Sequence, residues 1–263
     1  MSCVNDLLRH FPRAYNEDMK ITVLTIFPDQ FDSFLQHPLI KRAETNGLLK
    51  LSIVDLKPFA DGSFRHIDDS PYGGGAGMIL RCEPVYRALE QTRSGSSHVI
   101  AFTPSGTAYT QSRAHELLKL DDLIFICGHY EGMDERIMNA VDEEISVGDY
   151  ILSGGELPAM TVIDSLVRLT DGTLKPRSTE EESFENGLLE YPQYTRPAEY
   201  MGMHVPEVLR SGHAENIRLW RLKQSLRKTL KKRPDLLDQR PLTAEEAKLL
   251  KEIEEESDLP QCD

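Results

Sequence analysis

The sequence predicts an α/β fold in which a mostly parallel sheet is followed by a smaller helical part. Up to about residue 171, β-rich stretches alternate with stretches whose apolar residues recur at helical spacing. Alternation of this kind favours a parallel sheet with crossover helices. The run LIFIC at 123–127 is continuously apolar, as expected for a strand buried on both faces. From residue 198 onward the apolar pattern is helical alone.

The predicted elements follow one another in chain order. Strands are expected over 21–27, 48–56, 98–104, 123–128 and 143–152. Helices are expected from Pro28 to the stop signal Asn46-Gly47, and over 84–91, 111–120, 133–141 and 158–170. The carboxyl ends of parallel strands meet at one edge of a sheet, where ligands bind. The loops TPSG, GHYEG and LSGGE are therefore expected to line one pocket, mostly with backbone, for a small, adenosine-sized ligand.

Two glycine-rich stretches lie in loops of this part, Ser153-Gly154-Gly155 and PYGGGAGM at 71–78. Paired glycines after a strand let a backbone come close to a ligand or to another segment, because no Cβ obstructs the approach. Neither stretch has the GxxxxGK[ST] or GxGxxG spacing of phosphate-binding loops. An α/β enzyme with a nucleotide-like cofactor is therefore favoured over an NAD- or ATP-dependent one.

The charge is distributed unevenly along the chain. The net charge is −13, yet the segment 218–233, RLWRLKQSLRKTLKKR, holds eight positive charges and no acid. Its leucines recur at helical spacing, which predicts an amphipathic helix with a basic outer face. Such a face binds a polyanion such as RNA whatever the net charge, because salt screens fields beyond about 10 Å. The alternative is a solvated face that balances an acidic neighbour.

Composition and pattern together predict the organisation of the chain. No apolar run approaches the roughly 20 residues of a membrane-spanning helix, so we expect a cytoplasmic protein without a membrane partner. Four parts are expected: an N-terminal extension or mis-called start at 1–18, an α/β domain at 19–171, a linker or functional loop at 172–197, and a helical domain at 198–263.

Several motifs in a fixed order identify a family. They are FP after the first strand, DDSPYGGGAGM, TPSG, CGHYEGMDER, VGDYILSGGELPAM, LLEYPQYTRP and RLKQSLRKT. Over roughly residues 19–250 the chain resembles the bacterial tRNA (guanine-N1)-methyltransferase family, TrmD. The resemblance implies a SPOUT fold, whose parallel sheet carries a deep trefoil knot, and a small helical C-terminal domain that helps hold tRNA.

The resemblance also implies an activity and partners. S-adenosylmethionine would bind bent in the knot loops, and the methyl group would go to N1 of guanosine at position 37 of tRNA, just 3′ of the anticodon. The family is magnesium-dependent and forms homodimers with the active site at the subunit interface. A non-catalytic RNA-binding protein of the same fold, or a related knotted enzyme with another target base, are the alternatives.

The chemistry needs a base for the N1 proton and a cation near O6 of the guanine. By the resemblance, Glu182 is the base, at a place where the family usually has Asp, and Arg168 faces O6. The neighbouring Glu181 is an alternative base. Glu is one methylene longer than Asp and has nearly the same basicity. The replacement of the usual Asp by Glu182 therefore affects only where the carboxylate lies.

The remaining site residues are also assigned by the resemblance. Glu131 is assigned to the cofactor and is also a possible magnesium contact, and no metal site is firmly assigned. Cofactor binding is expected at Pro104, Gly128, Tyr130, Glu131, Val147, Gly148, Asp149, Tyr150, Ile151, Leu152, Gly154 and Gly155. tRNA binding is expected at Arg218, Arg221, Lys223, Arg227 and Lys228.

Overall fold

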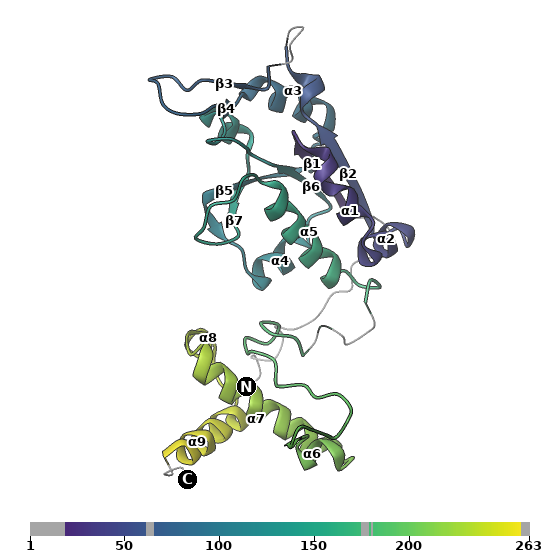
Figure 1. The fold of residues 1–263 in the computed structure, drawn as a ribbon, viewed down its shortest axis with the longest axis vertical. Helices are drawn as coiled ribbons and strands as arrows, with labels where there is room; N and C mark the ends of the chain where they lie inside the picture. Colours follow the sequence, from purple (N-terminus) through teal and green to yellow (C-terminus); the bar gives the residue numbers. More distant parts are fainter. Residues whose placement is uncertain (1–18, 62–65, 175–178, 180, 259–263) are drawn as a thin grey trace, which may run out of the picture. The chain divides into compact units, whose positions relative to one another are not determined.

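The chain forms two compact units that divide between residues 175 and 176. The structure, a computed structural model, describes residues 19–61, 66–174, 179 and 181–258, and Figure 1 traces the fold. The predicted N-terminal extension at 1–18 lies outside the described residues. Among the described residues, no helix combines the length and the apolar character needed to cross a bilayer.

The first unit is built on a five-stranded sheet in which every paired neighbour is parallel. The strand order is β2-β1-β6-β5-β7. The strands are β1 (Met19–Thr25), β2 (Leu49–Asp55), β5 (His98–Ala108), β6 (Asp122–Ile126) and β7 (Glu143–Ser146). This arrangement confirms the predicted parallel α/β sheet.

Side chains alternate between two apolar clusters, one on each face of the sheet. Leu123 and Phe125 of β6 belong to the first cluster, and Ile124 and Ile126 to the second. Helices α2 (Pro38–Thr45), α4 (Gln111–Leu117) and α5 (Glu156–Leu169) supply the first cluster, whereas α3 (Cys82–Thr92) supplies the second. Both faces are therefore covered, which explains why LIFIC is apolar at every position.

Most predicted elements differ in extent from the structure, and three differ in ways that the local sequence explains. The helix expected from Pro28 to Asn46 is divided into a 3₁₀ helix (Pro28–Phe31), α1 (Asp32–Leu35) and α2, because Pro38 cannot continue a helix from His37. The helix expected over 133–141 is a 3₁₀ helix, Glu135–Ala140. The strand expected over 143–152 ends at Ser146, since Gly148 has a positive φ of 153° and turns the chain.

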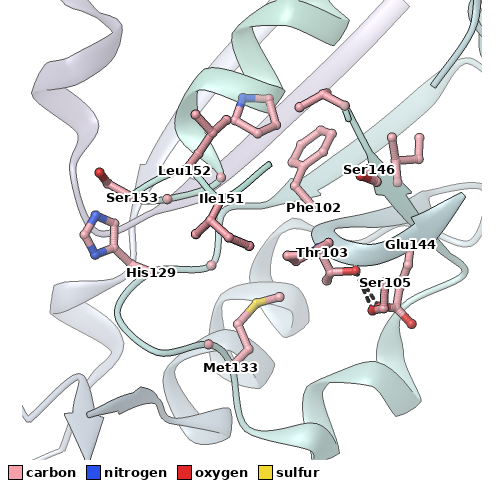
Figure 2. A pocket seen from close by; sticks show the side chains of 18 of the residues that line it. Phe102, Thr103, Ser105, His129, Met133, Glu144, Ser146, Ile151, Leu152 and Ser153 are labelled. Carbon is pink, nitrogen blue, oxygen red and sulfur yellow. Dashed lines mark hydrogen bonds between the residues drawn. The ribbon is translucent and has the colours of Figure 1, made fainter. Parts of the chain in front are cut away.

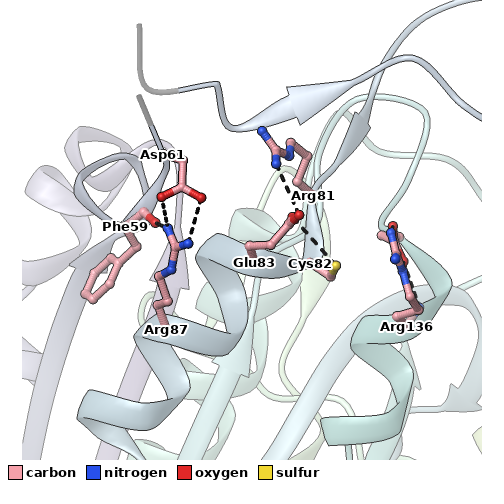
Figure 3. A network of polar contacts seen from close by, with 8 residues as sticks. Phe59, Asp61, Arg81, Cys82, Glu83, Arg87 and Arg136 are labelled. Carbon is pink, nitrogen blue, oxygen red and sulfur yellow. Dashed lines mark hydrogen bonds and ion pairs between the residues drawn. The ribbon is translucent and has the colours of Figure 1, made fainter. Parts of the chain in front are cut away.

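A network of ion pairs holds the outer surface of α3 (Figure 3). Arg87 donates to both carboxylate oxygens of Asp61 at 2.7 Å and to the carbonyl oxygen of Phe59 at 2.9 Å. Arg81, just before the helix, pairs with Glu83 at 3.1 Å. These contacts tie the 3₁₀ helix Lys57–Phe59 and the short pair β3 (Asp68–Asp69) and β4 (Ile79–Leu80) to the sheet unit.

The second unit is mainly helical. Leu188, Leu226 and Ile253 are buried in its core, so the segment before the helices packs onto them. An antiparallel pair, β8 (Glu199–Tyr200) and β9 (Met203–His204), precedes the helices and was not predicted from the helical pattern. The helices are α6 (Glu207–Arg210), α7 (Ala214–Lys232), α8 (Asp235–Asp238) and α9 (Ala244–Asp258).

Candidate functional site

A cavity of about 580 Å³ lies at the carboxyl ends of β6 and β7 and against the second half of β5. Its lining comes from 102–105, 128–135 and 144–155. The second and third segments contain GHYEG and LSGGE, as expected, whereas the TPSG motif, expected to follow a strand as a loop, lies within β5 where its pairing with β7 is irregular. Figure 2 shows Thr103, Ser105 and Glu144 grouped on one side of the cavity, with His129 and Ser153 on the other.

The paired glycines join two of these loops by close backbone contact. The N–H of Gly155 donates to the carbonyl oxygen of Gly128 at 2.8 Å, and His129 forms a β-bridge with Gly154. A Cβ on Gly155 would lie 2.7 Å from Cα of Cys127, and one on Gly154 would lie 2.5 Å from the His129 ring. Both distances are below van der Waals contact, so any larger residue would push the loops apart.

A turn at Gly148 forms the outer wall of the cavity. The N–H of Tyr150 donates to the Gly148 carbonyl oxygen at 2.9 Å, and a Cβ at Gly148 would lie 2.4 Å from the Tyr150 ring. Beyond the turn, the side chains of Tyr150 and Ile151 are 58% and 80% exposed. The loop therefore combines backbone along the cavity with the largely exposed side chains of Tyr150 and Ile151, which also belong to its lining.

The cavity collects most of the predicted cofactor-binding residues. Asp149 alone of the twelve is not among the lining residues. The lining includes Pro104, Gly128, Tyr130, Glu131, Val147, Gly148, Tyr150, Ile151, Leu152, Gly154 and Gly155.

A carboxylate with two hydroxyl donors was not anticipated. Glu144 Oε2 accepts hydrogen bonds from Thr103 Oγ1 at 2.7 Å and from Ser105 Oγ at 3.0 Å. The irregular pairing of β5 with β7 between Phe102 and Thr107 brings these residues together. Two hydroxyl residues on either side of Pro104, directly after a strand, were the available sequence signal.

Two further lining residues were also missed, His129 and Met133. The His129 ring packs against Phe27 at a centroid distance of 4.7 Å, and its Nδ1 atom is buried without a hydrogen-bond partner. The Met133 side chain lies against Gly128, where a Cβ would come within 3.0 Å. Both residues stand inside the recognised motif CGHYEGMDER, so their position in that motif was the signal.

Glu131 lies where the second glycine-rich stretch meets the cavity. Its N–H donates to the Met78 carbonyl oxygen at 3.0 Å, and a Cβ on Gly77 would lie 2.3 Å from its Cγ atom. The Glu131 side chain is exposed. In the described part of the chain, no group of three or more His, Cys, Asp or Glu side chains is arranged to hold a metal ion.

The two predicted catalytic residues belong to different units. Arg168 lies in the last turn of α5, in the first unit, and Glu182 lies in the turn that opens the second unit. Its neighbour Glu181 accepts a hydrogen bond from the Tyr191 hydroxyl at 2.6 Å and pairs with Arg221 at 3.3 Å. Glu181 is therefore held by two donors of its own unit.

The five cations predicted to bind tRNA all lie on α7, where each has a protein partner. Arg221 pairs with Glu181, and Lys228 donates to the carbonyl oxygen of Glu190 at 2.9 Å. The other three contact acids of α9: Arg218 contacts Glu245 at 2.7 Å, Lys223 contacts Glu252 at 2.9 Å and Glu256 at 2.8 Å, and Arg227 contacts Glu256. The alternative of a basic face that balances an acidic neighbour thus describes much of α7.

Comparisons with known proteins agree over nearly the whole described chain. The sequence model of the family described as tRNA (Guanine-1)-methyltransferase TrmD matches residues 19–239. A Streptococcus mutans protein named tRNA (guanine-N(1)-)-methyltransferase is 52% identical over 239 residues, which cover 90% of this chain and 99% of that protein. Proteins of the same name from Streptococcus agalactiae and Streptococcus pyogenes are each 51% identical over 90% of this chain, and the matches cover 95% and 99% of those proteins. The chain belongs to the TrmD family of tRNA (guanine-1)-methyltransferases.

Proposed function

We propose that this protein transfers a methyl group from S-adenosylmethionine to N1 of guanosine at position 37 of tRNA. The observation that carries the proposal is the cavity at the carboxyl ends of β6 and β7 and against β5, where glycines let two loops approach each other closely. Membership of an enzyme family that methylates guanine in tRNA supplies the reaction class.

The cavity fits S-adenosylmethionine in size and in chemistry. Pockets for ligands of this size usually measure about 300–1,000 Å³, and this one lies within that range. Backbone around Gly154 and Gly155 suits the edge of an adenine, and Ile151 and Leu152 offer apolar contact. The free backbone and hydroxyl groups would fix the orientation, and the cofactor would supply an electrophilic methyl group on a sulfonium.

Glu182 and Arg168 would carry the proton and charge chemistry. Guanine N1 must lose its proton to become a nucleophile, and the Glu182 carboxylate takes that proton in this proposal. Negative charge that develops at guanine O6 is stabilised by the Arg168 guanidinium. The family motif favours Glu182 over Glu181 as the base, and the Glu181 carboxylate is held by Tyr191 and Arg221.

Magnesium fits this chain only as a weakly held partner of the substrates. Mg²⁺ commonly binds through about one or two carboxylates and takes its other ligands from substrate and water. Glu131 offers one exposed carboxylate of that kind beside the cavity. We therefore propose a Mg²⁺ contact at Glu131 and derive no catalytic step from it.

We also propose a trefoil knot, a homodimer and a tRNA-binding domain. The segment 147–155 leaves β7, passes the end of β5, and bonds to the end of β6, a crossing that supports a SPOUT-type trefoil knot. Exposed Tyr150, Ile151 and Leu157 support a homodimer that would cover them. We propose a methyltransferase domain at 19–171 and a tRNA-binding domain at 198–263, with 172–197 as an active-site segment whose part 181–197 groups with the second unit. We place the protein in the cytoplasm with its tRNA substrate.

The proposal is tested with labelled S-adenosylmethionine and two unmodified tRNA transcripts. One carries guanosine at position 37, and the other carries adenosine there. Labelling of the first transcript alone, with the label recovered as 1-methylguanosine, supports both the reaction and the target. If neither transcript is labelled although calorimetry detects cofactor binding, the non-catalytic RNA-binding alternative replaces this proposal.

A further inference from the structure

Three side chains meet at the start of the segment that carries Glu182. The Tyr191 hydroxyl donates to Glu181 Oε2 at 2.6 Å, and Arg221 Nη1 donates to the same oxygen at 3.3 Å. The Arg221 guanidinium also lies over the Tyr191 ring, 4.8 Å from its centroid. We call Glu181, Tyr191 and Arg221 the Glu181 clamp. It joins the two ends of the segment 181–191 to helix α7.

The rest of the segment is fixed to α7 as well. Leu188 is buried in the core of the second unit, and the N–H of Leu189 donates to Thr229 Oγ1 at 2.9 Å. Lys228 donates to the Glu190 carbonyl oxygen at 2.9 Å. These contacts hold residues 188–190, so the clamp is what adds a fixed point at the other end, next to Glu182.

Glu182 itself lies in a tight turn between these fixed points. Its N–H donates to the Thr179 carbonyl oxygen at 3.1 Å, and its carbonyl oxygen accepts from the Glu185 N–H at 3.3 Å. The Glu190 N–H donates to Ser183 Oγ at 2.9 Å and closes the loop. The backbone on both sides of Glu182 is therefore defined, and a shift of Glu181 moves Glu182 with it.

We infer that Tyr191 and Arg221 are positioning residues for the base Glu182, and that they act by holding the Glu181 carboxylate against α7. The inference rests on the proposed function, because it assigns Glu182 as the base. It changes the role of Arg221 from a phosphate contact to a support of the catalytic segment. It also assigns Glu181 to anchoring rather than to proton transfer.

The chemistry of the three groups suits a permanent anchor. Burial and the hydrogen bond to Glu181 raise the pKa of Tyr191 to about 12, so its hydroxyl keeps the donated proton across the working pH range. A planar guanidinium can stack on the ring and donate to the carboxylate at once. The Tyr191 hydroxyl and the Arg221 guanidinium can thus both donate hydrogen bonds to the same oxygen of Glu181.

The experiment compares Tyr191→Phe and Arg221→Gln with wild type in steady-state and single-turnover methyl transfer to tRNA that carries guanosine at position 37. We expect each substitution to lower kcat about tenfold or more. Loss of one hydrogen bond, or a displacement of the Glu182 carboxylate by about 1 Å, is enough to slow catalysis by that factor. KM for tRNA and its salt dependence stay at the wild-type values. The kcat of the double variant should be only slightly lower than that of the less active single variant, because both substitutions disrupt the same anchor, the Glu181 carboxylate.

Tyr200→Phe is the matched control, because Tyr200 is an exposed tyrosine of the same unit outside the clamp. It is expected to leave kcat unchanged. Amide hydrogen exchange of 181–190 gives a readout that needs no activity: it should rise in both clamp variants and stay constant in the control. Thermal unfolding of each variant excludes loss of the folded unit as the cause.

Two results would overturn the inference while the proposed function stands. The first is an active wild type whose kcat is unchanged in Tyr191→Phe. The second is an Arg221→Gln variant whose only defect is a higher KM for tRNA with a salt slope smaller by about one, as expected for a lost phosphate contact. A wild-type protein that methylates neither transcript would instead overturn the proposed function itself.

Discussion

The N–H of Gly155 donates a 2.8 Å hydrogen bond to the carbonyl oxygen of Gly128, and so joins the loop after β7 to the loop after β6. The bond is possible because Gly155 has no Cβ; one would lie 2.7 Å from Cα of Cys127. This bond and the β-bridge of His129 with Gly154 therefore hold these two lining loops together.

Gly155→Ala is expected to weaken S-adenosylmethionine binding at least tenfold and to destabilise the fold by about 1–3 kcal/mol, because the added methyl meets backbone that cannot move aside. Calorimetry and urea unfolding measure the two effects. Gly95→Ala is the matched control, since nothing lies within 4 Å of a Cβ there. Normal cofactor affinity in Gly155→Ala would mean that this contact does not shape the site.

Glu182→Gln is expected to lower methyl transfer by about 10²–10⁴-fold, the usual contribution of a general base. Cofactor affinity should not change, because the cavity is lined by residues of the first unit only. Single-turnover experiments measure the rate of methyl transfer, and calorimetry measures cofactor affinity. Glu207→Gln, an exposed glutamate of α6, should behave as wild type. If Glu182→Gln kept the wild-type rate of methyl transfer, the general base would have to be Glu181 or water.

The acids of α9 are expected to weaken tRNA binding by occupying cations of α7. Glu256 contacts both Lys223 and Arg227, so Glu256→Gln should release Arg227 from its acidic partner and leave Lys223 with Glu252 alone. KM for tRNA should fall about two- to fivefold, the usual scale of exposed ion pairs. Glu254→Gln removes the same charge from the same helix and should have a smaller effect. Equal KM values in the two variants would exclude direct competition for these cations.

Asp122 is expected to make stability depend on pH. Burial opposes its ionisation, but hydrogen bonds from Ser97, Ser94 and Lys20 outweigh burial and hold the pKa of Asp122 below its ordinary value. A lowered folded-state pKa stabilises the protein above the unfolded value, and this contribution is lost as the pH falls through the folded value. Asp122→Asn should therefore cost about 1–3 kcal/mol at pH 7 and progressively less as the pH falls below about 4.

Urea unfolding at a series of pH values measures this difference. Asp29→Asn, at an exposed carboxyl group of the same unit, is the control and should show no such trend. A constant stability difference between Asp122→Asn and wild type across the series would show that the carboxylate charge is not what the hydrogen bonds stabilise.

The sequence by itself determined the parallel α/β sheet and most of the residues that line the cavity. Continuous apolar runs such as 123–127 require burial on both faces, and this local pattern leaves few alternatives. The motif VGDYILSGGELPAM in turn indicated the loop that meets the end of β6. Ordered motifs of this length also identified the family, which the match over residues 19–239 confirms.

Only the tertiary structure decided which charges are engaged with one another. Glu144 meets Thr103 and Ser105 because β5 pairs irregularly with β7, a register that no local pattern encodes. Arg221 and Glu181 are forty residues apart in sequence, yet they share a hydrogen bond. Backbone periodicity reports which face of an element is buried, whereas the partner of an exposed cation depends on which element packs beside it. The roles of Glu181 and Arg221 therefore came from the packing of 181–191 on α7.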